Sequence, residues 1–233
     1  MTDPTALPKY VQTAEMLIRE IGAGRLIAGE RLAPEREMAA GLGISVGTLR
    51  KALADLEKRG LLDRVQGSGN YVRAGAEAAG VYALFRLELL EGGGLPTADL
   101  LSVTRMAKPR GLPRFGSAAE GHRIRRLRRL GGLPAAVEEI WLDGDRAVQI
   151  APEDLSESLY LYYKSRLGFW ITRAEDAVSV GTVPDWAGPP FGLRPGAACG
   201  YIERTSHATD GSVPEVSRTW FDHTRAAYVA RLK

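Results

Sequence analysis

Apolar residues recur along this chain with two different spacings, one before residue 60 and another after residue 120. In the first part they return every three or four positions, which places them on one face of a helix. In the second part they stand in short runs, which is typical of strands. The pattern therefore predicts a helical segment followed by an α+β domain. The first apolar stripe consists of Tyr10, Ala14, Leu17, Ile18 and Ile21, and Gly22 follows it.

Two further helices are expected between Pro34 and Gly60. The segment EREMAAGL carries two glutamates in its first turn, where they favour the positive end of the helix dipole. Ser45 then stands at an N-cap position, ahead of another apolar stripe. Two helices joined by a short turn that contains glycine form a helix-turn-helix. The stripe of the second of these helices consists of Leu49, Ala52, Leu53 and Leu56.

The residues that follow Gly60 predict a β-hairpin. LLDRV and NYVR are strand-like, and the four residues Gln66-Gly67-Ser68-Gly69 between them supply glycines where the turn needs a positive φ. A hairpin directly after a helix-turn-helix is the wing of a winged helix. The first part of the chain is therefore expected to bind double-stranded DNA.

The buried stripe decides which side of the recognition helix DNA can reach. The opposite side, near the helix N-terminus, presents hydroxyl and cationic groups that suit base edges. Arg36 and the wing amides are placed to hold the flanking phosphates. Each of these residues alone would also fit a solvated surface or a tight turn. Their occurrence together in one predicted helix-turn-helix with a wing favours DNA binding. The predicted DNA-binding residues are Arg36, Ser45, Gly47, Thr48, Arg50, Lys51, Gly67, Ser68 and Gly69.

Composition and charge mainly exclude classes of function. The 31 Lys and Arg against 28 Asp and Glu leave a net charge of only +3, which locates no basic surface. The single cysteine, Cys199, forbids an internal disulfide, and the three histidines include no pair at i,i+4 spacing, so we expect no metal site and no cofactor. The segment MTDPTALPKY lacks the apolar core of a signal peptide, and no apolar run is long enough for a membrane span, so we expect a cytoplasmic protein.

Aromatic residues mark the division between domains. Of the 17 Phe, Trp and Tyr residues, only Tyr10 and Tyr71 precede residue 73. The segment AGAEAAG has no apolar pattern to bury, as expected of a linker. We therefore predict a DNA-binding domain at residues 1–73, a linker at 74–80 and a second domain at 81–233.

The second domain contains an unusually cationic strand. Strand-like runs occupy residues 121–130, 134–142, 177–181, 198–206 and 216–222, and the segment SESLYLYYKSRLG is expected to be helical. In HRIRRLRR the side chains alternate between two faces, so Arg126 shares the face of Ile124 and points toward an interior. A buried arginine requires an anionic partner, which suits a pocket for a phosphate or carboxylate ligand. A solvated basic strand or a second nucleic-acid surface remains an equal alternative.

The first domain resembles the DNA-binding domain of the GntR family of bacterial transcription regulators over residues 8–73. Its signature G-x-L-x-x-G-x-x-L-P-S-E-R-E-L-A is met by residues 24–39, with Ala33-Pro34 in place of Pro-Ser, and V-S-R-x-T-V-R-x-A-L is matched by residues 44–53. The resemblance implies DNA contacts by Arg36, Thr48, Arg50 and Gly67 or Gly69. Val46 stands where the family often has an arginine.

The second domain resembles the UTRA effector domain of the HutC subfamily, which shares its fold with chorismate lyase. The matching strings are Leu95-Pro96-Thr97, Arg126-Leu127-Arg128, Ala136-Val137-Glu138-Glu139, Ser158-Leu159-Tyr160 and the stretch from Asp210 to Arg218. The resemblance implies that Arg126, Glu138, Ser158 and Glu215 line a pocket for a small, anionic metabolite, a phosphosugar or an organic acid. Phe221 replaces a tyrosine that is frequent in the family.

Each pocket residue also has a purely structural alternative. Glu138 would pair with an arginine of the neighbouring strand, Glu215 would lie in an exposed hairpin, and Ser158 would only cap a helix. The tyrosines of residues 160–163 and Trp170 fit core or dimer packing. Arg173 is a weaker pocket candidate.

Together these patterns predict a ligand-responsive transcriptional repressor that binds a pseudo-palindromic operator as a homodimer. An enzyme of chorismate-lyase-like fold is the main competitor, and the sequence shows no activated nucleophile to favour it. A second competitor is an all-helical effector domain with a metal site, against which the strand-like runs and the few histidines argue. We therefore expect a regulator and not an enzyme.

Overall fold

The computed structural model describes residues 8–22, 25–73, 84–92, 94–155 and 158–230, and these form two compact units. A smaller unit lies within residues 7–86, and a larger unit spans Leu87–Tyr228. The predicted linker, residues 74–80, lies outside the described residues.

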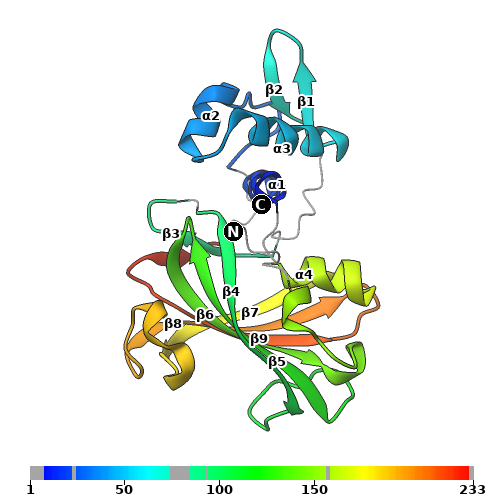
Figure 1. The fold of residues 1–233 in the computed structure, drawn as a ribbon, viewed down its shortest axis with the longest axis vertical. Coiled ribbons are helices and arrows are strands. Elements are labelled where there is room, and N and C mark those ends of the chain that lie inside the picture. The colour runs from blue at the N-terminus through cyan, green and yellow to red at the C-terminus, as the bar shows by residue number, and fades with distance from the viewer. Residues whose placement is uncertain (1–7, 23–24, 74–83, 93, 156–157, 231–233) are drawn as a thin grey trace. The chain divides into compact units, whose positions relative to one another are not determined.

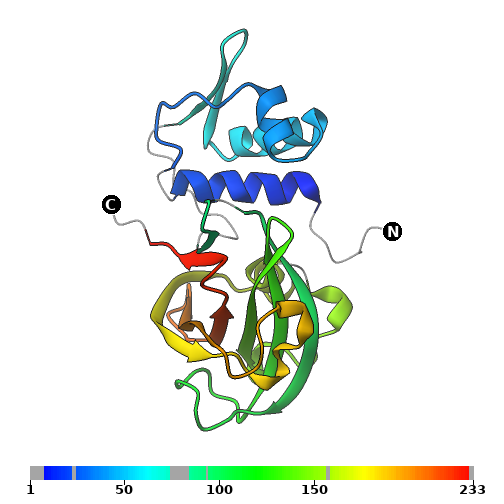
Figure 2. The same cartoon turned by 90° about the vertical axis from the view of Figure 1, so that its left-hand side faces the viewer.

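The smaller unit is a winged helix-turn-helix, as the apolar pattern predicts (Figure 1). Figure 2 shows its first helix along its length. The buried side of α3 consists of the four predicted residues, and Ser45 caps this helix by accepting a hydrogen bond from the Thr48 amide at 3.1 Å. Gly60, with a φ of 74°, follows its last turn. The elements are α1 (Lys9–Gly22), α2 (Glu35–Gly41), α3 (Val46–Lys58), β1 (Leu62–Val65) and β2 (Gly69–Val72).

The wing is a regular antiparallel hairpin. Leu62 pairs with Val72 and Val65 pairs with Gly69, so the turn lies at residues 66–68. The Ser68 amide donates to the Val65 carbonyl at 3.0 Å, and both Gly67 and Gly69 have positive φ. The two glycines therefore give the turn a conformation that other residues rarely adopt.

The larger unit is built on one six-stranded antiparallel sheet in the order β4-β5-β6-β9-β8-β7. Two short strands, β3 (Leu87–Leu89) and β10 (Ala226–Tyr228), pair separately. The helix expected at residues 156–168 is observed as α4 (Leu159–Tyr162) followed by a π-helical turn, η3 (Tyr163–Leu167). The sheet strands are β4 (Pro96–Ala107), β5 (Glu120–Leu130), β6 (Leu133–Asp143), β7 (Ile171–Thr182), β8 (Ala198–Ala208) and β9 (Glu215–Phe221).

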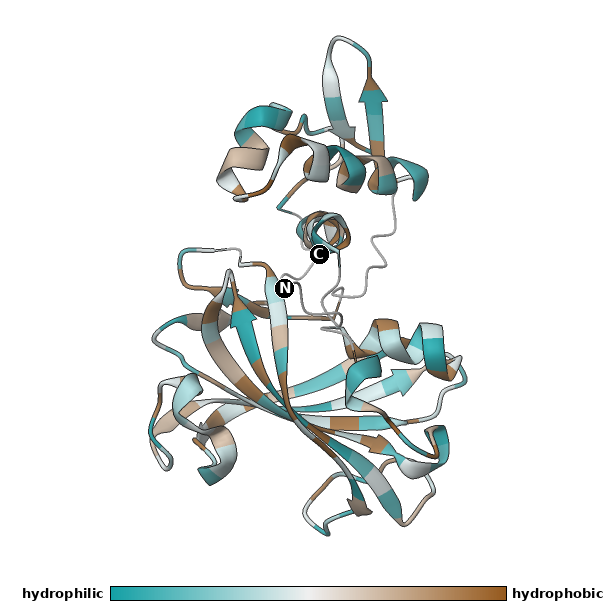
Figure 3. Ribbon diagram, viewed as in Figure 1, coloured by the Kyte–Doolittle hydropathy of each residue, from teal (hydrophilic) through white to brown (hydrophobic). Residues whose placement is uncertain are grey.

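Five of these strands fall where strand-like runs predict them, and β4 does not. Its sequence, PTADLLSVTRMA, mixes adjacent apolar residues with charged ones, because the strand lies at a sheet edge and contains a register shift between Leu100 and Ser102. In Figure 3 hydrophobic and hydrophilic bands alternate along the sheet strands. The alternation reflects two sheet faces with different surroundings.

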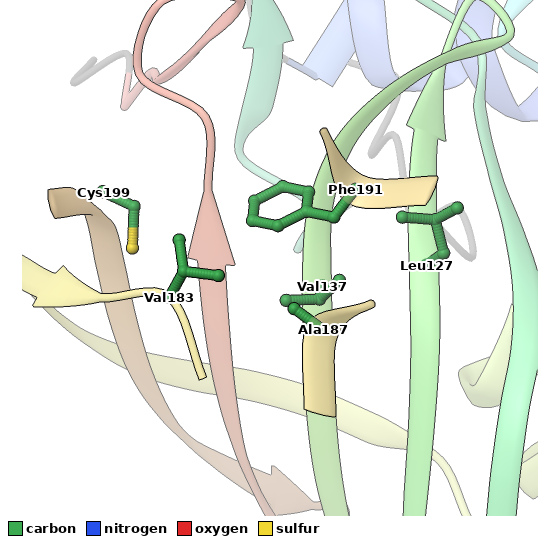
Figure 4. Close-up of a cluster of buried hydrophobic side chains, with 6 residues drawn as sticks. All are labelled: Leu127, Val137, Val183, Ala187, Phe191 and Cys199. Atoms are coloured by element: carbon green, nitrogen blue, oxygen red, sulfur yellow. The ribbon is translucent and has the colours of Figure 1, made fainter. Parts of the chain in front are cut away.

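One face of the sheet carries two clusters of buried apolar side chains. Leu127 and Val137 pack there against Phe191 and Ala187, which come from the short helices η4 (Asp185–Ala187) and η5 (Pro189–Phe191) (Figure 4). A second cluster on the same face joins Phe115, Trp141 and Val216. We call the opposite face, which carries Arg126, Glu138 and Glu215, the polar face. No helix among the described residues is long and apolar enough to cross a membrane.

Candidate functional site

The predicted DNA-binding residues lie on α2, α3 and the wing of the smaller unit. The side chains of Arg36, Arg50 and Lys51 are on exposed residues, and Thr48 is half-buried. The Thr48 hydroxyl lies 2.8 Å from the Ser45 hydroxyl that caps the helix, so Ser45 orders the start of α3. Of the wing residues, Gly67 is exposed and Ser68 and Gly69 are half-buried.

A single carboxylate connects the recognition helix to the wing. Arg50 Nε donates to Glu35 Oε2 at 2.6 Å, and Arg64 Nη2 donates to Glu35 Oε1 at 3.3 Å. The hydrogen bond and charge of Arg50 hold the pKa of Glu35 below its ordinary value. Sequence reasoning treats Glu35 only as a charge near a helix dipole and does not identify Arg64. We call these three residues the Glu35 clamp.

The Arg50 side chain is 64% exposed even while it contacts Glu35. An exposed ion pair contributes little to stability, so Arg50 can exchange this carboxylate for a DNA phosphate or a guanine edge at low cost. The clamp therefore orients Arg50 without burying it.

A hollow of about 490 Å³ lies between α2 and the wing. Glu35 and Arg64 line it, together with residues 65–70 of the hairpin. A Cβ atom at Gly69 would lie 3.0 Å from Arg31 Nε, and the φ of Gly69 is 135°. The backbone conformation of Gly69 therefore favours glycine, and any side chain there would also displace Arg31 slightly.

In the larger unit, two arginines converge on one buried carboxylate. Arg126 Nη2 donates to Glu138 Oε2 at 2.8 Å, and Arg128 Nη2 donates to the same oxygen at 3.0 Å. All three side chains are less than 10% exposed. Burial alone would raise the pKa of Glu138, but Arg128 and Arg126 lower it to about 2. Glu138 does pair with arginines of the neighbouring strand, as the structural alternative expects, and it does so inside the protein.

Glu215 lies in a second buried group on the same face. The Tyr163 hydroxyl donates to Glu215 Oε2 at 2.6 Å, and the Ser206 hydroxyl donates to Oε1 at 2.8 Å. Glu215 is only 2% exposed, so the structural alternative of an exposed hairpin position is wrong. Burial raises the pKa of Glu215 although both hydroxyls oppose it. Burial and the neighbouring Glu215 charge raise the pKa of Tyr160 to about 12.

A third arginine completes the polar face. Arg204 donates from Nε and Nη2 to the two oxygens of Asp176 at 2.6 and 2.7 Å. The Tyr228 hydroxyl donates to Asp176 Oδ2 at 2.8 Å. The pKa of Arg204 is raised: burial opposes the rise, and the charges and hydrogen bonds of Tyr160 and Asp176 outweigh it.

The other two predicted pocket residues are placed differently. Ser158 is buried and caps α4, with its hydroxyl accepting from the Leu161 amide at 3.4 Å. Phe221 is 6% exposed, and its ring occupies the space that a side chain at position 200 would need, which explains Gly200. Arg173 lies on the opposite face, exposed, and contacts Glu175 and His207.

Strand register brings the predicted residues Arg126, Glu138 and Glu215 to one sheet face. Arg126 pairs with Glu138 of β6, and Glu138 pairs with Thr219 of β9. Glu215 lies four residues before Thr219 on β9, so its side chain is on the same face. Alternation along β5 already indicates Arg128, since it lies two residues after Arg126. The structure also places Tyr163, Asp176, Arg204 and Ser206 on this face. No local sequence pattern indicates these four residues. Among the described residues, no group of three or more His, Cys, Asp or Glu side chains could hold a metal ion.

Two family profiles match the chain. The profile of bacterial regulatory proteins of the gntR family matches residues 9–72, and the UTRA domain profile matches residues 91–227. The HTH-type transcriptional regulator SmoD of Agrobacterium fabrum is 62% identical, covering 98% of this chain and 97% of its own length. The histidine utilization repressor of Pseudomonas putida is 26% identical over 69% of this chain and 66% of its own length. The solved structure of possible transcriptional regulator YydK from Bacillus subtilis has a TM-score of 0.55 at 22% identity, covering 97% of this chain and all of its own.

Proposed function

The chain belongs to the GntR family of transcriptional regulators and carries a UTRA domain, and from this premise we propose that it is a repressor controlled by a small anionic metabolite. It binds a pseudo-palindromic operator as a homodimer, and the metabolite binds the polar face of the larger unit. The observation that carries the proposal is the convergence of Arg126 and Arg128 on the single buried carboxylate of Glu138.

A ligand anion suits this arrangement for an electrostatic reason. Guanidinium groups that are already desolvated and held by Glu138 lose little side-chain freedom when they bind a phosphate or carboxylate. The neighbouring Glu215 and Tyr160 present groups that hydrogen-bond hydroxyls of a sugar or hydroxy acid. A phosphosugar or an organic acid is therefore the proposed class of effector.

DNA binding is assigned to α3 and the wing. Arg50 and Lys51 are exposed near the start of α3 and suit base edges and phosphates. Arg36 and the residues Gly67-Ser68-Gly69 suit the flanking backbone. The effector can alter operator occupancy only to the extent that it binds the DNA-competent and incompetent forms with different affinity.

A thermal-shift screen of phosphosugars and organic acids, each matched with its uncharged parent sugar or amide, tests the effector class. We expect charged compounds to raise the unfolding temperature and their neutral counterparts to leave it unchanged. Stabilisation by neutral sugars alone would contradict an anionic effector.

Fluorescence anisotropy with operator and scrambled DNA tests the regulator itself. We expect the protein to prefer its own promoter palindrome across a salt titration, and a stabilising anion to weaken that binding. Equal affinity for both DNAs at every salt concentration would contradict sequence-specific regulation.

A further inference from the structure

The six-stranded sheet has two outer strands, β4 and β7, and they differ in accessibility. Arg105 of β4 donates to the carbonyls of Ala147 and Val148, each at 3.0 Å, and so ties a loop to that strand. In β7 the only register shift lies between Ile171 and Arg173, and pairing with β8 is continuous from there to Thr182. Within the described part of the chain, no strand pairs with the outer edge of β7.

Charged residues protect only the first half of this edge. β7 contains Arg173, Glu175 and Asp176, whereas Ala177–Thr182 has the uncharged sequence AVSVGT. Native sheets usually blunt an open edge with charges, proline or bulges, because an unblunted edge pairs with another strand. The second half of β7 therefore has the properties of a strand that pairs with another chain.

Two valines make the same half apolar on one face. Val178 is 48% exposed and Val180 is 80% exposed, and residues two apart on a strand lie on the same side. That side is the polar face, since Val178 pairs with Ile202 and Ile202 pairs with Thr219 in the register of Glu138. A strand laid along this edge would bury both valines.

Charge restricts the register in which a second copy of this segment can pair with the first. In antiparallel self-pairing about Glu175 or Asp176, carboxylates of the two copies would face each other, which is destabilising. Pairing about Ser179 places Val178 opposite Val180 of the other copy, and each Asp176 opposite a Thr182. This register joins β-branched residues on one face and sets no like charges opposite each other.

We propose that Ala177–Thr182 of β7 pairs antiparallel with the same segment of a second copy, centred on Ser179, so that the two sheets become continuous. The inference rests on the proposed function, because a pseudo-palindromic operator requires two copies related by a twofold axis. It adds the location and register of the contact between them.

Cysteine cross-linking of the full chain tests the register. In Ser179→Cys the two thiols lie at the axis, and mild oxidation should give a covalent dimer on a non-reducing gel. In the matched variant Thr182→Cys the two Cα atoms lie about 20 Å apart, since each is three strand residues from the axis, so no cross-link should form. Cys199, which is 1% exposed, is present in both variants and in the parent chain, which gives the background.

A charge variant gives a second measurement of the same contact. Val180→Lys should raise the dimer dissociation constant on the order of tenfold in light scattering, because it places a cation in an apolar seam. Val148 is 91% exposed and lies away from this edge. Val148→Lys should therefore leave the dimer dissociation constant unchanged. Far-UV circular dichroism checks that both variants are folded.

The outcomes separate the two proposals. A dimer in which Ser179→Cys fails to cross-link, or cross-links no better than Thr182→Cys, would overturn the β7 interface and leave the proposed regulator intact. A parent chain that is monomeric in light scattering but still binds palindromic DNA as a monomer would overturn both the interface and the homodimer.

Discussion

Glu35 is a residue whose role depends on two partners that lie far from it in sequence. It contacts Arg50, 15 residues away, and Arg64, 29 residues away. Both arginines belong to elements that meet DNA in a winged helix. In the proposed mode of DNA binding, the carboxylate orients these two cations and also competes with DNA for them.

We expect Glu35→Gln to raise affinity for scrambled DNA while lowering the ratio of operator to scrambled affinity by about tenfold, the order expected when one bidentate base contact loses its orientation. Fluorescence anisotropy at a fixed salt concentration measures both values. Glu37→Gln removes the same charge from an exposed position on the same helix. Glu37→Gln should raise the affinity for scrambled DNA to a similar extent but preserve the ratio of operator to scrambled affinity. An equal loss of this ratio in both variants would argue against the Glu35 clamp.

In the larger unit, Glu138 is likewise a carboxylate that holds two arginines, Arg126 and Arg128. Glu138→Gln should lower the free energy of unfolding by about 3–5 kcal/mol, because it leaves two buried guanidinium groups without their carboxylate. Inorganic phosphate should restore part of this loss by binding the same cations, as measured by thermal unfolding. Glu139→Gln is the control, since Glu139 pairs with Arg125 on the opposite face. Rescue by phosphate in both variants would show that the anion acts elsewhere.

The low pKa of Glu138, about 2 against an ordinary value of 4.5, also predicts a pH dependence. Because the pKa is lower in the folded state, the carboxylate stabilises the protein above pH 4.5, and this contribution is lost as the pH falls toward 2. The difference in unfolding free energy between the parent chain and Glu138→Gln should therefore shrink over that interval. Chemical denaturation at several pH values measures it, and a constant difference would contradict the ion pair.

At the scale of elements, glycine is favoured by the backbone conformation in the wing, but not in the recognition helix. Gly69 has a positive φ and lies against Arg31, whereas a Cβ at Gly47 would meet only Ser45 Oγ at 3.9 Å. Gly69→Ala should lower the free energy of unfolding by about 1–3 kcal/mol, and Gly47→Ala should raise it by up to about 1 kcal/mol. Urea denaturation compares the two variants. Equal effects would contradict the conformation of the hairpin turn.

At the scale of the whole molecule, the polar face reaches the strands through which the chain leaves the larger unit. Tyr228 contacts Asp176, which holds Arg204 near Tyr160. Tyr228 also pairs with Leu87 in the two-stranded sheet β3–β10, where the larger unit begins and ends. A shift of Arg204 would therefore be transmitted by hydrogen bonds to the strand pair β3–β10 at the two ends of the larger unit.

We expect Tyr228→Phe to bind an effector with nearly unchanged affinity but to need a higher effector concentration to release operator DNA. Calorimetry measures the first quantity, and anisotropy of labelled operator measures the second. Tyr201→Phe, which removes a hydroxyl bonded to Glu203 on the other sheet face, is the control and should change neither. If effector binding and DNA release shifted together in Tyr228→Phe, this residue would act in binding and not in coupling.

The sequence by itself determined the winged helix and most strands of the larger unit. The stripe of Leu49 and its neighbours, the cap Ser45 and the turn glycines act through residues a few positions apart, so local spacing carries the information. Alternation along β5 likewise placed Arg126 on the face of Ile124. The burial of Arg126 then decided between an inward position and a solvated strand.

Only the tertiary structure decided which charged groups meet. The pairs Arg50–Glu35, Arg126–Glu138 and Tyr163–Glu215 join residues 15, 12 and 52 positions apart. Their contacts depend on helix packing and on the register of strands that are far apart in sequence, such as β6 and β9. A shift of one residue in that register would turn Glu215 to the apolar face, which is why no local pattern indicates its partners.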